Sequence, residues 1–235
     1  MRIVSKFAKE ENVKFISHLD MMRTFQRAIR RAYLPISFTQ GFNPHPKMAF
    51  ASALSVGVTS EGEYIDLTLK NDVAVEEFNK RLNDVLPLGL KILRSAEMPM
   101  NAPTLMSIID KALYRFYFQK SKDDFGKQIQ EFFRQNVILV SNEKKGTLNH
   151  TNIRPLMELV NIDESHSNFD KVDVLLNSGS KSNLKPTLVL SAMIDFLQAD
   201  IEALNSKIHR LELFLIREEQ LMTPIDLALH LYGRQ

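Results

Sequence analysis

The order in which strand-like and helix-like patterns follow one another is the feature that most constrains this fold. Apolar alternation predicts strands, a spacing of three to four residues predicts helices, and prolines mark where they end. The first hundred residues read as strand 2–8, helix 17–33, short strand 36–39, extended stretches 48–58 and 64–69, helix 75–86 and strand 88–93. After residue 103 a similar order returns, with strands 112–119, 137–140, 172–176 and 208–216 and helices 123–135 and 186–204.

This repeated βαββαβ order predicts an α+β protein of two consecutive ferredoxin-like units, each with an antiparallel sheet and two helices on one face. The two prolines of Met98–Pro103 leave the backbone extended or turning there, which indicates a linker. We therefore predict an N-terminal domain at 1–98, a linker at 99–107 and a C-terminal domain at 108–235. One larger mixed sheet is the alternative.

Composition excludes several classes of protein. The 235 residues include no cysteine, which removes disulfides, thiolate metal sites and cysteine nucleophiles. Apolar residues make up 44% and charged residues 25%, as in ordinary globular domains. The N-terminus lacks the apolar core of a signal peptide, and no apolar run is long enough to span a membrane. We expect a soluble, cytoplasmic protein without a membrane contact.

Positive charge is concentrated at the front of the chain, where residues 1–50 carry nine lysines and arginines against three acids. Helix 17–33 begins with Ser17 as a good N-cap and is stopped by Pro35. Projected at about 100° per residue, its basic side chains fall in one stripe with Asp20, opposite the apolar face. The stripe consists of Arg23, Arg27, Arg30 and Arg31. Guanidinium groups suit phosphates and carboxylates, so we expect an anionic ligand here, with an ordinary solvated helix face as the alternative.

A stiff loop follows the short strand after this helix. Its two prolines restrict the backbone, Gly41 permits a positive φ, and the other side chains offer aromatic, amide, imidazole and ammonium groups. The candidate ligand-binding residues of this loop are Gln40, Phe42, Asn43, His45 and Lys47. We expect the loop and the arginine stripe to meet at one end of the first sheet. A rigid connection with Phe42 in the core is the alternative.

Metal-binding and catalytic patterns are weak by comparison. The six histidines form no i, i+4 pair, and no phosphate-binding or nucleophile motif occurs. We expect no metal and no cofactor. A set of His18, Asp20 and His45 has the groups that acid–base cleavage of RNA requires, if the fold brings them together.

The second half offers one further anion-binding candidate. A Gly/Ser-rich loop at 178–184 leads through Lys185 into the helix that starts at Pro186. Free amides at such a helix entrance can bind a phosphate. An ordinary strand-to-helix connection is the alternative.

The stretch 17–69 resembles the radical SAM-linked, or radical SAM-associated, protein family, a domain of unknown function. The likeness rests on the helix start Ser-His-Leu-Asp, the arginine-rich helix, the loop and a Glu-Tyr-x-Asp strand, and it extends to Asn-Ile-Arg-Pro at 152 and Ser-Asn-Leu-Lys-Pro at 182. The residues that carry it are Ser17, His18, Asp20, Arg23, Gln40, Gly41, Phe42, Asn43, Pro44, His45, Pro46 and Lys47. The resemblance implies a partner encoded beside, or fused to, a radical SAM enzyme, often near genes of RNA metabolism and ribosomal proteins, and it implies no established reaction.

Three functional hypotheses follow from the sequence. The first is a non-enzymatic module that binds RNA or another anionic substrate for a radical SAM partner. The second is an adaptor whose arginine stripe docks on an acidic face of that enzyme. The third is a ribonuclease or RNA-modifying enzyme that uses His18 and His45.

Overall fold

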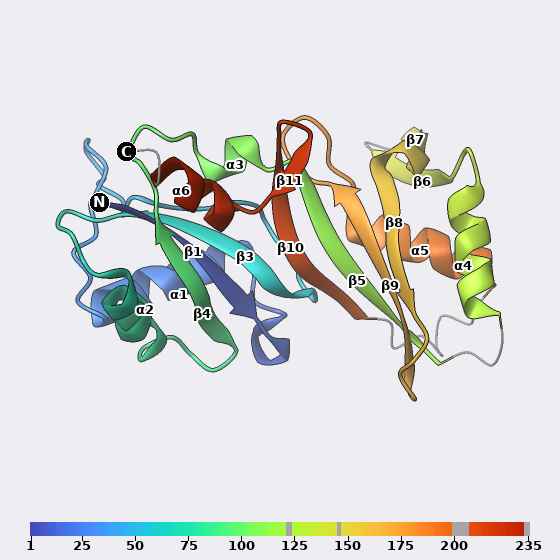
Figure 1. Cartoon of the computed structure of the whole chain (residues 1–235), viewed down its shortest axis with the longest axis horizontal. Helices are drawn as coiled ribbons and strands as arrows, with labels where there is room; N and C mark the ends of the chain where they lie inside the picture. The colour runs from blue at the N-terminus through green and yellow to red at the C-terminus, as the bar shows by residue number, and fades with distance from the viewer. Residues whose placement is uncertain (121–123, 145–146, 199–206, 233–235) are drawn as a thin grey trace. The chain divides into compact units, whose positions relative to one another are not determined.

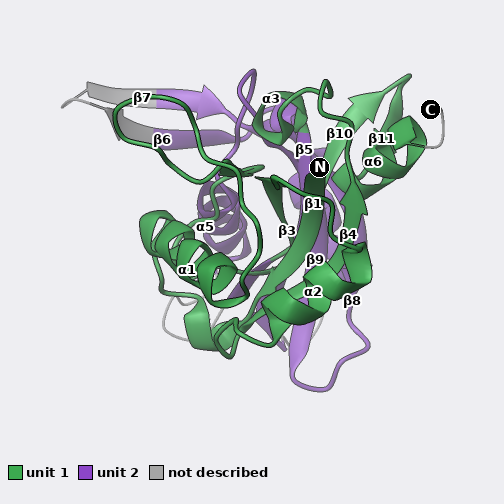
Figure 2. Cartoon of the chain, turned by 90° about the vertical axis from the view of Figure 1, so that its left-hand side faces the viewer, with its two compact units in different colours: residues 1–110, 210–235 green, residues 111–209 purple. Residues whose placement is uncertain are grey.

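The computed structural model describes residues 1–120, 124–144, 147–198 and 207–232. They form two compact units, of which unit 1 comprises residues 1–110 and 210–235 and unit 2 comprises residues 111–209 (Figure 2). Each unit combines helices with antiparallel strand pairs. The prediction of an α+β protein with antiparallel sheets is therefore confirmed at this level.

Unit 1 is built on a sheet in the order β4-β1-β3, with β10 beside β3 (Figure 1). Its long strands are β1 (Arg2–Lys9), β3 (Thr59–Thr68), β4 (Leu90–Glu97) and, from residue 210 onward, β10 (Lys207–Arg217). The short strands β2 (Met48–Phe50) and β11 (Gln220–Met222) pair with β3 and β10. Its helices are α1 (His18–Arg31), α2 (Val75–Asn83), α3 (Leu105–Ile108) and α6 (Pro224–Tyr232), with a 3-10 turn at Glu11–Val13.

The core of unit 1 lies between the sheet and helices α1 and α2. The alternation of β1 places Ile3 and Phe7 on this face, where they pack with Phe25 of α1 and Phe78 of α2. The ring centroids of Phe7 and Phe25 lie 4.9 Å apart in an edge-to-face arrangement. Helix α6 packs against β1 and β4 on the opposite face of the sheet (Figures 1 and 2).

Unit 2 contains a sheet in the order β5-β9-β8 and a separate hairpin. The strands are β5 (Lys111–Gln119), β8 (Met157–Asp163) and β9 (Phe169–Asn177), and the hairpin consists of β6 (Leu139–Lys144) and β7 (Thr147–Asn152). The helices are α4 (Phe125–Arg134) and α5 (Pro186–Leu197), with a 3-10 turn at Arg154–Leu156. The phenylalanines of β5 and α4, including Phe116 and Phe132, are buried.

The division of the chain differs from the predicted consecutive domains. Residues 210–235 group with unit 1, whereas the sequence placed them in a C-terminal domain at 108–235. Hydrogen bonds explain this return: Ser60 Oγ donates to the carbonyl oxygen of Arg210 at 3.1 Å, and Tyr64 Oη donates to Glu212 at 2.7 Å. The predicted linker 99–107 also lies within unit 1, where the Arg2 guanidinium donates to the carbonyl oxygens of Ala102 and Pro103 at 2.6 and 2.8 Å.

Several predicted elements need correction. The predicted strand 36–39 forms only isolated bridges, Ile36 with Leu69 and Phe38 with Pro46, and the extended stretch 48–58 is a strand only as far as Phe50. There the chain turns, and Gly57, at a φ of +86°, donates its N–H to the carbonyl oxygen of Lys14 at 2.9 Å. Helix α2 ends at Asn83 instead of residue 86, and Asp123 and residues 199–204, at the ends of predicted helices, lie outside the described residues. The sequence analysis missed α3, β7, β8, β11 and α6.

Candidate functional site

Helix α1 presents the predicted arginine stripe to solvent. The Ser17 hydroxyl accepts a hydrogen bond from the Asp20 amide at 3.2 Å, which satisfies a free N–H group of the first turn. Met21, Phe25, Ala28 and Ile29 face the core. The opposite face exposes all four predicted arginines, Arg23, Arg27, Arg30 and Arg31.

Internal carboxylates neutralise little of this positive charge. Arg23 Nη1 lies 3.3 Å from Asp20 Oδ1 in an exposed ion pair. A hydrogen bond from the Ser17 hydroxyl is the main cause that lowers the pKa of Asp20, so this carboxyl group stays ionised at neutral pH. Within the described residues, no acidic side chain forms an ion pair with Arg27, Arg30 or Arg31.

The turn after α1 brings a further chain segment next to the arginine stripe. Tyr33 has a φ of 51°, in the left-handed region. The Leu34 amide donates a hydrogen bond to the carbonyl oxygen of Ile29 at 3.2 Å. The chain then runs beside the end of β3, where Ser37 donates to Thr68 at 2.8 Å and Lys70 donates to Pro35 at 2.7 Å. These backbone bonds place residues 33–38 and Lys70 next to α1.

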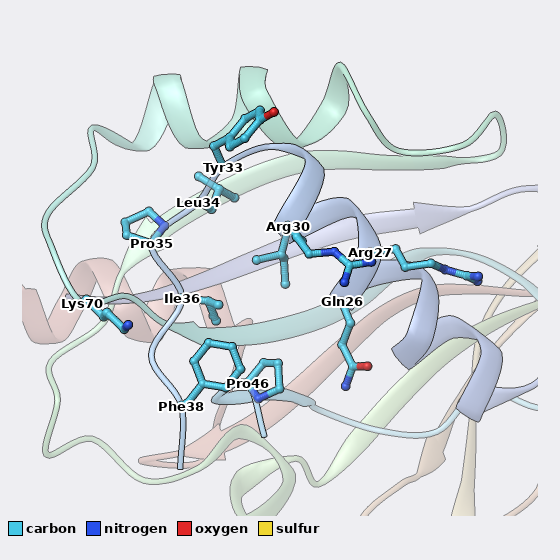
Figure 3. Close-up of a pocket in the computed structure, with 11 residues that line it drawn as sticks. Gln26, Arg27, Arg30, Tyr33, Leu34, Pro35, Ile36, Phe38, Pro46 and Lys70 are labelled. Carbon is cyan, nitrogen blue, oxygen red and sulfur yellow. The ribbon is translucent and has the colours of Figure 1, made fainter. Parts of the chain in front are cut away.

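An open recess lies between α1 and this segment, with a volume of about 540 Å³. We call it the α1 recess. Its lining residues are Gln26, Arg27, Ile29, Arg30, Tyr33, Leu34, Pro35, Ile36, Phe38, Pro46 and Lys70. Figure 3 shows Gln26, Arg27 and Arg30 on α1, with Lys70 reaching in from the opposite side. The lining contains three cationic side chains and no acidic one.

The predicted loop contributes less to the recess than expected. Its base is closed by two bonds between Thr39 and His45, in which the Thr39 amide donates to the His45 carbonyl at 2.8 Å and the His45 amide donates to Thr39 Oγ1 at 2.9 Å. Gly41 has the positive φ that the sequence suggested, +128°. Pro46 lines the recess, but the candidate residues Gln40, Phe42, Asn43, His45 and Lys47 do not. Phe42 is fully exposed, so the core position considered for it is wrong.

The candidate acid–base residues are not gathered in one cavity. His18 packs edge-on against Phe50, with ring centroids 5.4 Å apart. It also lines a small cavity of about 20 Å³ with Lys9 and Glu63, and His45 does not line that cavity. Burial, the largest cause, lowers the pKa of Lys9, while Glu63 acts in the opposite direction.

The remaining candidate, Lys185, lies in unit 2. It is exposed at the N-cap position of α5, with Pro186 in the first turn, and it belongs to a different unit from the α1 recess. Over the described residues, no group of three or more histidines, aspartates and glutamates is placed to hold a metal ion. None of the helices among the described residues of either unit has the length and apolar character of a membrane span.

Sequence reasoning missed four recess residues that stand out in the structure: Gln26, Tyr33, Phe38 and Lys70. Lys70 lies 39 positions after Arg31 in the sequence, and backbone contacts of residues 68–70 with residues 35–37 bring it next to α1. A usable signal existed for Tyr33, because an aromatic residue directly after a helix and two residues before a proline occupies a position that favours glycine.

A family model described as "Uncharacterized protein conserved in bacteria (DUF2344)" matches residues 2–186 of the chain. The protein belongs to the DUF2344 family. The matched span includes the whole α1 recess and ends at the start of α5. No curated protein matches the chain.

Among solved structures, this DUF2344 protein is similar to a chain of one titled "Crystal Structure of a Cbf5-Nop10-Gar1 Complex". The sequence identity is 11% and the TM-score is 0.43, over 98% of the DUF2344 chain. The DUF2344 chain spans about half, 54%, of the length of that chain.

Proposed function

We propose that unit 1 of this DUF2344 protein is a non-enzymatic module that binds RNA through the α1 recess. The observation that carries the proposal is that Arg27, Arg30 and Lys70 line one open recess without an acidic neighbour in its lining. Three cations around one concave surface whose lining holds no acidic residue attract a polyanion, and guanidinium groups donate well-oriented hydrogen bonds to phosphate oxygens. Other anionic substrates would bind to the same cations. We propose RNA, and the experiment below tests RNA binding.

The resemblance to radical SAM-linked proteins supports a second part of the proposal. In this part, the module holds the RNA for a radical SAM enzyme in the cytoplasm. A reducing compartment suits the chain, because it has no cysteine and forms no disulfide. Co-purification with that enzyme from nuclease-treated lysate, together with RNA affinity of the isolated protein, is the expected result. Co-purification without any RNA affinity would instead support the adaptor hypothesis.

The ferredoxin-like assignment of both units is also a proposal. In unit 1 it is supported by the chain order β1-α1-β2-β3-α2-β4 and by the strand order β4-β1-β3, with β2 pairing antiparallel to β3. Such a sheet leaves the end of α1 and the turn after β3 side by side, which is where the recess lies.

The direct test compares RNA binding by the wild-type protein and by the recess variant Arg27→Ala/Arg30→Ala/Lys70→Ala. We expect the recess variant to bind about tenfold to a hundredfold more weakly in a fluorescence anisotropy titration. The slope of log K against log salt concentration should also flatten by about 2, because each cation on single-stranded RNA contributes about 0.7.

A matched control removes the same charge elsewhere on unit 1. Lys80, Lys91 and Arg94 are exposed on α2 and β4 and do not line the recess. The control Lys80→Ala/Lys91→Ala/Arg94→Ala should retain most of the wild-type affinity. Equal losses in both triple variants, or undiminished binding by the recess variant, would contradict the proposal.

A further inference from the structure

The α1 recess contains aromatic side chains as well as cations. Phe38 lines it and is 43% exposed. Lys70 Nζ lies 5.9 Å from the centre of the Phe38 ring. Lys70 lies over one face of this partly exposed ring, so a phosphate held by the lysine would lie next to a flat heterocycle in contact with the ring.

Tyr33 supplies a second aromatic group at a structural cost. Its backbone lies in the left-handed region, at the position after a helix that glycine usually occupies. Arg81 holds this backbone in place by donating to the carbonyl oxygens of Ala32 and Tyr33 at 3.0 and 2.5 Å. The side chain gains little packing in return, because it is 86% exposed. A strained, exposed aromatic residue at the edge of a recess points to contact with a ligand.

From these contacts we infer that the α1 recess seats one unpaired nucleotide of a single-stranded RNA. The base stacks on Phe38, Tyr33 lies at the rim, and Arg27 and Arg30 hold the adjoining phosphate groups. This inference rests on the proposed function and narrows it to single strands. In a duplex both faces of each base are covered by neighbouring bases, whereas an unpaired base can leave the stack and lie on an aromatic side chain.

The size of the recess agrees with one nucleotide. A volume of about 540 Å³ falls within the range of about 300–1,000 Å³ typical of pockets for small ligands. The apolar side chains of Ile29, Leu34 and Ile36 form part of its lining. A site for phosphate groups alone would not need apolar and aromatic walls.

The absence of tryptophan from the chain allows a direct optical test. Phe38→Trp introduces a single tryptophan into the recess, and a base stacked on it quenches its fluorescence. Phe15→Trp is the matched control, because Phe15 is exposed before the start of α1 and does not line the recess. Both variants are titrated with a short single-stranded RNA, with the same strand annealed to its complement, and with free adenosine monophosphate.

We expect strong quenching of Phe38→Trp by the single strand, weak quenching by the duplex and by the free nucleotide, and little change in Phe15→Trp. In anisotropy titrations, Phe38→Ala should weaken single-strand binding about 5- to 150-fold, the range measured for one stacked base. Phe38→Leu should show a similar loss, because leucine keeps the apolar bulk and lacks the aromatic face.

The outcomes separate this inference from the proposed function. If the recess triple variant loses RNA binding while Phe38→Ala and Phe38→Leu retain it, the module binds RNA and the inferred site for an unpaired nucleotide is wrong. Equal binding of duplex and single strand, or quenching by the free nucleotide alone, would also overturn that site. If neither form of RNA binds and an acidic protein quenches Phe38→Trp instead, both proposals fail.

Discussion

At the scale of single residues, Tyr33 at the end of α1 combines an unfavourable backbone conformation with an exposed side chain. Tyr33 adopts a left-handed conformation that costs a bulky side chain about 1–2 kcal/mol. Glycine adopts this conformation without a clash between Cβ and the following carbonyl oxygen. The exposed ring of Tyr33 adds little apolar burial to offset that cost.

Tyr33→Gly should therefore raise the free energy of unfolding by about 1 kcal/mol, after allowing for the extra freedom of glycine in the unfolded chain. Urea denaturation would measure this gain. The same variant should weaken RNA binding, because Tyr33 is one of the residues at the edge of the α1 recess.

Tyr33→Ala separates the two effects. Alanine removes the ring but keeps the Cβ atom and most of the left-handed penalty. RNA binding should weaken as in Tyr33→Gly, without the gain in stability. A Tyr33→Gly protein less stable than Tyr33→Ala would show that the conformation is not the source of strain.

At the scale of elements, buried polar contacts attach connecting segments to the sheet of unit 1. Arg2 donates two hydrogen bonds to Asp66 Oδ2, at 3.1 and 2.6 Å, and both side chains are nearly inaccessible to solvent. The same guanidinium donates to carbonyl oxygens of Pro99, Ala102 and Pro103. One arginine of β1 thus anchors the start of the segment that the sequence identifies as a linker.

Arg2→Ala should lower the free energy of unfolding by about 3–5 kcal/mol, because it leaves Asp66 buried without a partner. Arg23→Ala, which breaks the exposed pair with Asp20, should cost less than about 1 kcal/mol. The double variant Arg2→Met/Asp66→Leu should recover much of the stability while leaving residues 99–103 sensitive to proteolysis. Resistance of that variant to proteolysis would argue against the anchoring role of Arg2.

The contact between β3 and β10 within unit 1 predicts a pH dependence. Burial, with help from the Glu212 carboxylate, raises the pKa of Tyr64 well above its usual value. A raised folded pKa means that this stabilisation is fully present below the unfolded pKa, near 10, and is lost as the pH rises above it.

Tyr64→Phe isolates this effect. The difference in unfolding free energy between wild type and Tyr64→Phe should stay constant from about pH 8 to about pH 9.5 and then shrink toward about pH 11. Urea denaturation across this range measures it. A difference that is flat up to the highest pH would mean that the Tyr64 hydroxyl ionises equally in both states.

At the scale of the whole molecule, unit 1 is discontinuous in sequence. A close backbone approach joins its two parts: a Cβ atom at Gly62 would lie 2.5 Å from Glu212 Cα and from the Leu211 carbonyl oxygen. Glycine is thus required at this position of β3 if β10 is to lie beside it.

Gly62→Ala should cost about 3 kcal/mol or more, because the clash is with backbone atoms that cannot turn away. Hydrogen exchange of residues 210–217 should accelerate in the same variant. Gly41→Ala is the control, with a φ of +128° and no atom within 4 Å of its added Cβ. It should cost about 1–2 kcal/mol of strain and leave exchange in β10 unchanged.

Local patterns predicted the elements whose signals lie within a few residues. Helix α1 has its cap at Ser17, its apolar face and the stop before Pro35 all within one stretch, and strands β5 and β10 alternate in sequence. Helix α6 was missed because its apolar residues cover much of its circumference and show little amphipathic contrast.

The sequence predicted only the part of the candidate site that depends on neighbouring residues. The arginine stripe follows from helical periodicity, which is a property of neighbouring residues. The partners that form a recess with Arg27 and Arg30 come from the turn after β3 and from the segment that bridges back to it, and no local pattern encodes these contacts.

The amino-acid sequence by itself determined the α+β class, the basic face of α1, the closed turn around Gly41 and the lack of thiol chemistry. Each of these depends on residue type and short-range geometry. Only the tertiary structure decided that residues 210–235 complete unit 1, that Lys70 and Phe38 join the arginines, and that most of the loop stays outside the recess. Those outcomes depend on backbone hydrogen bonds and packing between residues far apart in the chain, whose free energy is set when the whole sheet assembles.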